Sequence, residues 1–216
     1  MSGGVGRRGS LGTRSPVIGL IGPIGCGKST VAGWLAAHGA AIVDADRLTR
    51  SIMTPGSPVT DDVIAHFGPE YRLADGSLDR AALGRLVFAD PVRLAELESI
   101  VHPAVSLSEQ DAIAAADASR PAAIVLEAIK LVEAGHAGWC DEVWLVECGP
   151  ETQLARLVGR GMPPDDARQR ISAQSGSLTL WRSAAARVIH TDGEPAAVEA
   201  TVAAAMDEVV AAVDQS

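Results

Sequence analysis

The chain has 216 residues, of which 47% are hydrophobic, enough for one sizeable core but too short for two full domains. Its formal net charge of -9 and isoelectric point near 5.0 argue against a general nucleic-acid-binding surface, which needs a basic stripe. The longest apolar runs are far shorter than a bilayer requires, so we expect no membrane span.

The first fifteen residues, Met1 to Ser15, are mostly Gly, Ser and Arg and have almost nothing to bury. We expect a disordered extension there. Its arginines could suggest a targeting peptide, but the apolar segment of a secretory signal does not accompany them.

A glycine-rich segment is the strongest motif in the chain. Residues 22–30 read GPIGCGKST and fit the pattern G-x-x-x-x-G-K-[ST]. The apolar run Val17–Ile21 precedes it as an expected strand, and residues 31–38 follow with helical periodicity. Backbone amides of such a loop and of the following helix bind phosphate oxygens. A glycine-rich turn before an ordinary helix is the alternative, but both flanks favour a nucleoside triphosphate site.

Two side chains of this loop have expected chemical roles. Lys28 should reach the β- and γ-phosphates of ATP, and the Ser29 hydroxyl should ligate Mg²⁺. The predicted ATP-binding residues of the loop are Gly25, Cys26, Gly27, Lys28, Ser29 and Thr30.

The next apolar run, from Ala41, is expected to form a second strand that ends in Asp44 and Asp46. Ligands of open parallel sheets sit beyond the carboxyl ends of the strands, so both acids should lie near the phosphate loop. The alternative role for either acid is to cap the helix that follows.

Residues 53–120 show helical patterns broken by turns and no strand pattern, which predicts a helical insertion between two strands of the sheet. The expected helices cover residues 58–67, 79–88 and 91–118, the last as one helix or two. An insertion beside a phosphate loop often carries the second substrate, and we expect that role here.

Strand character returns at residues 122–127, and this run ends in Glu127. An acid in that position is typical of a Walker-B element and is predicted to hold Mg²⁺ directly or through water. Lys130 is expected mainly to form a structural ion pair, with Glu127 or Glu133.

The remaining chain continues the alternation of strands and helices. Residues 142–147 and 187–190 are expected strands, and residues 150–158, 167–174 and 194–213 are expected helices. Arg156 and Arg160 lie four residues apart before a segment, about 160–177, that suits a lid closing over phosphates with positive charge. A solvated helix face is the alternative for these arginines.

This alternation predicts an α/β fold, a P-loop kinase fold with a parallel five-stranded sheet flanked by helices, a helical insertion and a helical lid. We divide it into a core of residues 16–52 and 121–216 and the insertion.

The three cysteines, Cys26, Cys140 and Cys148, are odd in number and form no C-x-x-C pair. They predict neither a disulfide framework nor a zinc site. A reducing, cytoplasmic setting fits them best.

The function classes open to a phosphate loop can be narrowed. The chain contains no asparagine, so the Asn-Lys-x-Asp motif that reads guanine in GTPases is absent. An energy-coupling ATPase usually brings larger domains. A phosphate loop, an acid after the second strand, a helical acceptor domain and an arginine lid are together typical of small-molecule kinases.

Further segments resemble dephospho-CoA kinases. They are VDAD at 43–46, DGSLDRAAL at 75–83, VHP at 101–103, PETQLARL at 150–157 and RISAQ at 170–174. The resemblance covers nearly everything after Ser15. It implies transfer of the γ-phosphoryl of ATP to the ribose 3′-hydroxyl of dephospho-CoA, with Mg²⁺ as cofactor and without nucleic-acid or membrane partners.

The resemblance also implies site roles. Asp46 matches the proposed general base, Arg80 and His102 match acceptor-binding residues, and Arg156 and Arg160 match arginines that hold nucleotide and phosphate, with Arg160 also catalytic. Three places depart from the family pattern: the phosphate loop, with Pro23 and Cys26 where Gly and Ser are common, residues 129–133, which form one wall of the site, and residues 190–192, near the adenine. Another P-loop small-molecule kinase and a non-catalytic nucleotide sensor stay open as alternatives. The oligomeric state is unknown, with a monomer favoured.

Overall fold

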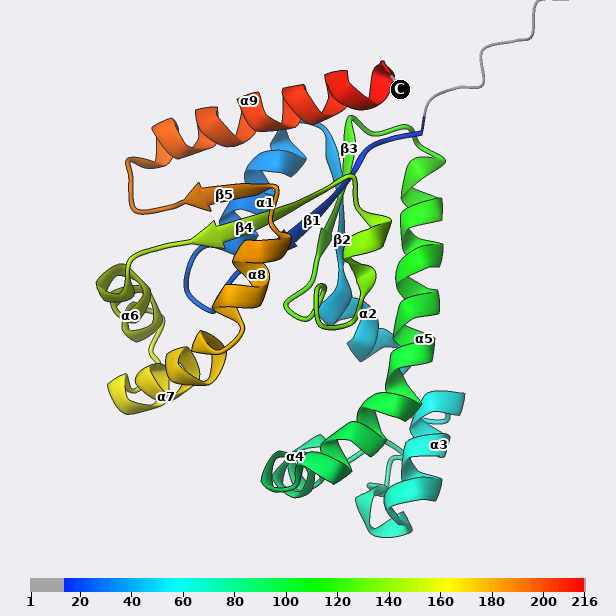
Figure 1. The fold of residues 1–216 in the computed structure, drawn as a ribbon. Helices are drawn as coiled ribbons and strands as arrows, with labels where there is room; N and C mark the ends of the chain where they lie inside the picture. The colour runs from blue at the N-terminus through cyan, green and yellow to red at the C-terminus, as the bar shows by residue number, and fades with distance from the viewer. Residues whose placement is uncertain (1–13, 216) are drawn as a thin grey trace, which may run out of the picture.

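The computed structural model describes residues 14–215 of the chain. Its centre is a sheet of five parallel strands in the order β2-β3-β1-β4-β5 (Figure 1), which confirms the predicted fold class. The strands are β1 (Val17–Ile21), β2 (Ala40–Asp44), β3 (Ala123–Glu127), β4 (Glu142–Glu147) and β5 (Arg187–His190).

An α-helix follows every strand except β3, which is followed by a 3-10 turn, and most helices lie where the periodicity predicts them. They are α1 (Lys28–Ala37), α2 (Ala45–Ile52), α3 (Pro58–Phe67), α4 (Arg80–Ala89), α5 (Pro91–Asp117), α6 (Pro150–Gly159), α7 (Pro164–Ser175), α8 (Leu178–Ala184) and α9 (Pro195–Asp214), with short 3-10 turns η1 (Pro69–Tyr71) and η2 (His136–Trp139). Helix α5 is one continuous helix, although Pro103 lies inside it. Helix α8 has no counterpart among the predicted elements.

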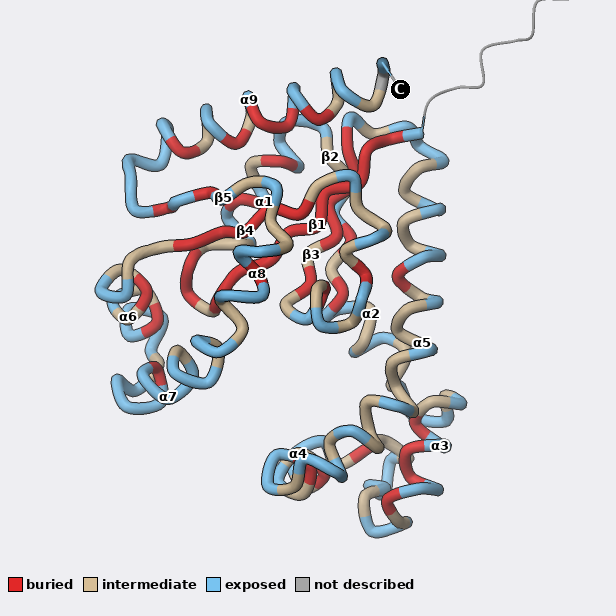
Figure 2. The backbone as a smooth tube through the Cα atoms, in the orientation of Figure 1, coloured by how far each residue is buried: buried red, intermediate tan, exposed pale blue. Residues whose placement is uncertain are grey.

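Both faces of the sheet are covered, because alternate side chains of each strand point to opposite sides. On β1, Ile18 and Leu20 pack with α1 and α9, whereas Val17 and Ile21 pack with the second half of α5 and with Trp181 of α8. Figure 2 shows that buried residues are concentrated in the inner strands β3, β1 and β4. A parallel sheet buried on both faces explains why its strands read as continuous apolar runs.

The insertion between β2 and β3 has a small core of its own. Val63 and Phe67 of α3 pack against Leu83 and Val87 of α4 and against the first half of α5. Because α5 also packs on the sheet with its second half, this helix links the insertion to the core (Figure 1). No strand of the sheet interrupts the described residues between β2 and β3, as predicted.

The start of the described chain is anchored. The predicted disordered extension falls on residues 1–13, which lie outside the described residues, and on Arg14 and Ser15, which do not fit it. The Arg14 guanidinium pairs with Asp141 at 2.6 Å, and the Ser15 amide donates to Asp117 at 2.8 Å. Within residues 14–215, no helix has the length and apolar character needed to cross a membrane.

Candidate active site

The loop between β1 and α1 has the backbone shape of an anion cradle. Gly25 and Gly27 have φ angles of 83° and 92°, a left-handed conformation that glycine adopts without strain. A Cβ at Gly22 would lie 2.3 Å from the Val146 carbonyl oxygen, so only glycine lets the loop lie this close to β4. Helix α1 starts at Lys28, and its first-turn amides face the loop with the positive end of the helix dipole.

A polar cavity of about 250 Å³ opens above this loop. It is lined by the loop and the start of α1, by residues at or just after the ends of β2 and β3, and by Arg50 of α2 and Arg160 at the end of α6. The lining residues are Pro23, Ile24, Gly25, Gly27, Lys28, Ser29, Asp44, Asp46, Arg50, Glu127, Ile129 and Arg160. Acids, a lysine and two arginines thus meet at the carboxyl edge of the sheet, where the topology predicts a ligand.

Lys28 and Glu127 shape the charge of this cavity. Burial lowers the pKa of the Lys28 ammonium, while Glu127 and Asp46 act in the opposite direction. Lys28 Nζ donates to the Gly22 carbonyl at 2.9 Å, so it lies folded over the loop. Burial also raises the pKa of Glu127, with Lys28 opposing that shift.

Asp44 and Asp46 separate into different roles. Asp44 is the N-cap of α2, because its side chain accepts from the Arg47 amide at 2.9 Å. Asp46 is exposed and lies two residues further along, in the first turn of α2, and no side-chain hydrogen bond holds it among the described residues. The capping alternative therefore accounts for Asp44 and leaves Asp46 available for chemistry.

Ser29 and Glu127 fit a magnesium ion. The Ser29 hydroxyl donates to Glu127 Oε1 at 3.2 Å, so two hard oxygen donors meet beside the phosphate cradle. No cluster of three or more His, Cys, Asp or Glu arranged for a metal occurs in the part of the chain that the structure describes. Mg²⁺ matches this sparse donor set, since it retains waters and takes phosphate oxygens as ligands.

A second, largely apolar cavity of about 390 Å³ lies next to the first. It is enclosed between α5 and the segment after β3, and its lining includes Leu97, Val101 and His102. Asp46 and Ile129 line both cavities. Asp46 therefore stands where the polar phosphate cavity meets an apolar one.

A buried acid–imidazole pair in the wall of the apolar cavity was not predicted. Glu109 Oε2 lies 2.7 Å from His136 Nδ1, and the two side chains are 3% and 7% exposed. His136 also contacts the Ser106 hydroxyl at 2.9 Å and stacks on Trp139. Burial raises the pKa of Glu109 to about 7 and lowers the pKa of His136. The acidic residue Glu109 within a long helical pattern was the only feature of the sequence that pointed to this pair.

The predicted nucleotide arginines share a further cavity beside the loop, and Arg160 also lines the phosphate cavity. Arg156 Nη1 and Nη2 donate to Thr191, to its hydroxyl at 2.9 Å and to its carbonyl at 2.6 Å. Arg156 and Arg160 line a third cavity, of about 150 Å³, together with Gly27 and Thr30. Thr191 thus has a defined contact, although residues 190–192 depart from the pattern that the resemblance predicts.

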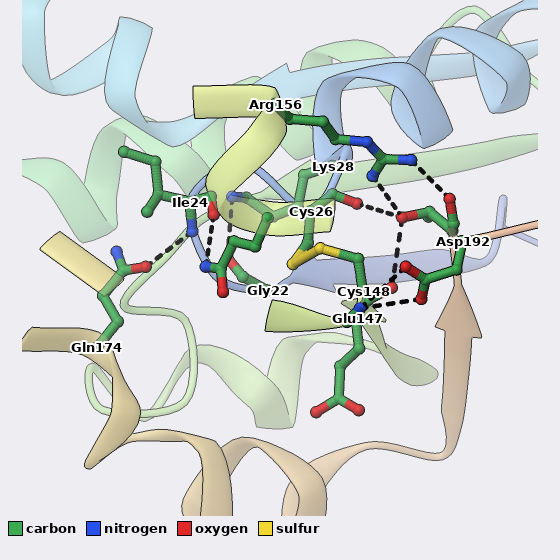
Figure 3. Close-up of a disulfide and its surroundings, with 12 residues drawn as sticks. Gly22, Ile24, Cys26, Lys28, Glu147, Cys148, Arg156, Gln174 and Asp192 are labelled. Carbon is green, nitrogen blue, oxygen red and sulfur yellow. Dashed lines mark hydrogen bonds between the residues drawn. A yellow bond between two sulfur atoms is a disulfide. The ribbon is translucent and has the colours of Figure 1, made fainter. Parts of the chain in front are cut away.

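Two glutamines fasten the helices after β4 to the phosphate loop. The Ile24 amide donates to Gln174 Oε1 of α7, and Gln153 Nε2 of α6 donates to the Ile24 carbonyl, both at 2.7 Å. Figure 3 shows Gln174 reaching the loop. Neutral side chains that bond to backbone give no sequence signal, so this clamp was not predicted.

Comparisons with known proteins agree with this geometry. The family model described as dephospho-CoA kinase matches residues 16–196. A dephospho-CoA kinase of Symbiobacterium thermophilum is 44% identical over 190 residues, covering 88% of this chain and 79% of that protein. One from Thermobifida fusca is 40% identical over 192 residues, covering 88% of this chain and 94% of the other. The chain belongs to the dephospho-CoA kinase family.

Solved structures show the same fold. A Thermus thermophilus protein superposes with a TM-score of 0.75 at 31% identity, covering 90% of this chain and 98% of its own. The dephospho-CoA kinase from Campylobacter jejuni has a TM-score of 0.60 at 18% identity, with 90% and 97% coverage. At 18% sequence identity, the second match supports the fold alone.

Against this family background, two charged residues lie differently from their expected contacts. Arg80 does not line either of the two adjoining cavities; its Nη2 donates to the Met53 carbonyl at 3.1 Å and ties α4 to the end of α2. Lys130 pairs with Glu98 of α5, and not with Glu127 or Glu133. The long α5 passes beside the segment after β3, which places Glu98 within reach of Lys130. His102, in contrast, lines the apolar cavity.

The prediction of no disulfide was wrong. Cys26 and Cys148 form a disulfide across 122 residues, and Cys140 is the free cysteine (Figure 3). The cause is the sheet topology, because Ile21 at the end of β1 pairs with Leu145 near the end of β4. The loops that leave these neighbouring strands bring the two cysteines together, and no sequence spacing reports that.

Proposed function

We propose that this protein transfers the γ-phosphoryl group of ATP to the ribose 3′-hydroxyl of dephospho-CoA. One observation carries the proposal beyond family membership: Asp46 lies where the phosphate cavity meets the apolar cavity. A kinase needs an acid at the junction of donor and acceptor sites, and this one is not occupied by a capping bond.

The phosphate loop is assigned to ATP. Amides of the loop and of the first turn of α1 bind the phosphates, Lys28 neutralises the β- and γ-phosphates, and Thr30 and Arg156 border the nucleotide beyond them. Arg160 lines both the phosphate cavity and the cavity beside Arg156. That position suits a side chain that stabilises the charge of the transferring group.

Ser29 and Glu127 would hold Mg²⁺, the hydroxyl as a direct ligand and the carboxylate directly or through water. When bound, the ion neutralises charge on the β- and γ-phosphates.

The acceptor is assigned to the apolar cavity and the helical insertion, about residues 53–120. His102 and Ile129 border the acceptor at the cavity, and Arg80 holds α4 against α2, the helix that carries Asp46. Residues 160–177 act as the lid, which the Gln174 contact to Ile24 supports.

Phosphoryl transfer passes through a loose transition state, so positioning and charge stabilisation dominate catalysis. Asp46 orients the 3′-hydroxyl and accepts its proton as the oxygen attacks phosphorus. Lys28 and Arg160 balance the charge on the transferring oxygens. General-base assistance of this kind contributes about 10²-fold or more.

The test is ADP release from Mg·ATP with dephospho-CoA as acceptor, with adenosine, AMP and shikimate as controls. We expect turnover with dephospho-CoA only. Turnover with another acceptor in its place would contradict the assigned substrate, and absence of turnover with all four would contradict the kinase assignment.

A further inference from the structure

The disulfide joins the middle of the phosphate loop to the residue that follows β4, as Figure 3 shows. Cys26 is fully buried, and the two Cα atoms are 5.1 Å apart, within the usual span of a disulfide. We propose that Cys26 and Cys148 form a reversible dithiol–disulfide site whose oxidised state preorganises the phosphate loop for ATP. The inference rests on the proposed ATP site.

The crosslink lies under the loop and leaves its binding face open. Gly25 and Gly27, on either side of Cys26, line the phosphate cavity, whereas Cys26 does not. Both glycines keep their left-handed conformation with the disulfide in place. The oxidised loop is therefore already shaped to receive phosphate, and formation of the disulfide does not block the ATP site.

The hydrogen bonds around the disulfide connect it to the nucleotide arginine. The Thr191 hydroxyl contacts the carbonyl oxygens of Cys26 at 2.8 Å and of Glu147 at 3.3 Å, and it accepts from Arg156. The disulfide thus ties the loop to the residue after β4, and Thr191 ties it to the residue after β5. In the dithiol state the loop keeps its hydrogen bonds to Thr191, Gln153 and Gln174 but loses its covalent tie at Cys26, so ATP binding has to order that part of the loop.

A small reagent reaches the pair from one side. A cavity of about 80 Å³ between α6, α7 and α8 is lined by Cys148, Gln153, Gln174 and Arg182, and Cys26 is not part of its lining. Attack from outside therefore falls on the Cys148 sulfur. Cys140 is excluded as a partner in exchange, because burial raises the pKa of its thiol to about 12.

The chemistry needs an oxidised low-molecular-weight disulfide as co-reactant. The Cys148 thiolate attacks it, forms a mixed disulfide and releases one thiol. The Cys26 thiolate then displaces the second thiol from the Cys148 sulfur and closes the protein disulfide. Two protein thiols are oxidised by two electrons, and one small disulfide is reduced to two thiols. An excess of small thiol reverses both steps.

The experiment compares the full-length protein after incubation with oxidised glutathione and after incubation with dithiothreitol. Of the three cysteines, two are in the disulfide, so titration of the denatured protein should give one free thiol when oxidised and three when reduced. Mg·ATP binding is then measured by calorimetry without acceptor. We expect the dissociation constant for ATP to be about 3- to 10-fold higher in the reduced protein, in the range of preorganisation effects.

Two variants locate the effect. Cys148→Ser should bind ATP like the reduced wild type under both conditions. Cys140→Ser is the matched control and should keep the full difference between oxidised and reduced protein. The wild-type comparison needs no substitution, so it stands even if Cys148→Ser does not fold.

Three titrated thiols after oxidation, or equal ATP dissociation constants in the two states, would overturn the proposal, and so would tighter binding by the reduced protein. Turnover with dephospho-CoA is measured on the same samples. Lost turnover with intact ATP binding contradicts the proposed function alone, whereas normal turnover with a redox-independent dissociation constant contradicts the redox site alone.

Discussion

At the scale of single residues, the contrast between Asp44 and Asp46 decides the assignment of the base. Asp44 is held by the Arg47 amide, and Asp46 borders both cavities. We expect Asp46→Asn to lower turnover by roughly 10²-fold, because it removes the proton acceptor, with ATP affinity little changed. Steady-state kinetics and calorimetry with Mg·ATP measure the two quantities.

The matched control for that substitution is Asp44→Asn, since asparagine caps helices as well as aspartate does. It should lose far less turnover than Asp46→Asn. If Asp46→Asn loses ATP affinity and turnover in parallel, Asp46 belongs to the metal shell and the assignment of the base is wrong.

The second residue-scale prediction concerns Glu109. Because burial raises its pKa from 4.5 to about 7, the folded protein holds this proton more tightly than the unfolded chain. Its contribution to stability is therefore lost as pH rises from about 4.5 to about 7. Glu109→Gln should remove that loss. Between about pH 4.5 and pH 7, the free energy of unfolding should therefore fall by roughly 2 to 3 kcal/mol less in the variant than in the wild type.

Urea denaturation at pH 5 and pH 8 measures the Glu109 effect. The lowered pKa of His136 acts in the opposite direction, with stability rising as pH rises toward 6.5, but both proteins retain that imidazole. The difference between them therefore isolates Glu109. Identical pH dependence in the two proteins would show that the carboxyl is not perturbed.

At the scale of elements, the contact between α7 and the phosphate loop is the most direct support for a lid. Gln174→Ala leaves the Ile24 amide without its acceptor. One hydrogen bond contributes about 0.5 to 1.5 kcal/mol, so we expect the KM for ATP to rise about 2- to 10-fold. Gln174→Glu keeps an acceptor oxygen and serves as the control. An unchanged KM in Gln174→Ala would contradict a role of the Gln174–Ile24 contact in ATP binding.

Helix α8, which the sequence did not predict, has Trp181 as its one fully buried side chain. Trp181 is 1% exposed, packs on the sheet and donates to Glu133 at 2.9 Å. Trp181→Ala should cost about 3 to 5 kcal/mol of stability through the cavity it leaves. Trp181→Phe retains most of the packing and should cost clearly less. Urea denaturation compares them, and equal losses would mean that the hydrogen bond, and not burial, holds α8.

At the scale of the whole molecule, the elements with strong periodicity could be predicted, and contacts between distant segments could not. The runs at 17–21 and 58–67 match β1 and α3 residue for residue, because the apolar run of a buried strand and the capping residues of a helix lie within or next to the segment itself. Helix α8 is seven residues long, and its apolar side chains are too few to show a period.

The candidate site divides in the same way. The loop and the acids at the strand ends could be predicted, because parallel topology brings the carboxyl ends of strands together. The disulfide, the Ile24 clamp and the Glu109–His136 pair could not, since each joins residues from segments far apart in the chain. Lys130 shows the same limit, because its partner Glu98 lies on a helix 32 residues away.

The site is assigned to phosphorylation of the 3′-hydroxyl of dephospho-CoA. The most direct measurement is phosphorus NMR of the product made by the full-length protein from Mg·ATP and dephospho-CoA. We predict one new phosphomonoester signal that couples to the ribose H3′ proton and depends on Asp46. A signal coupled to another ribose proton, or none while ADP accumulates, would contradict the claim.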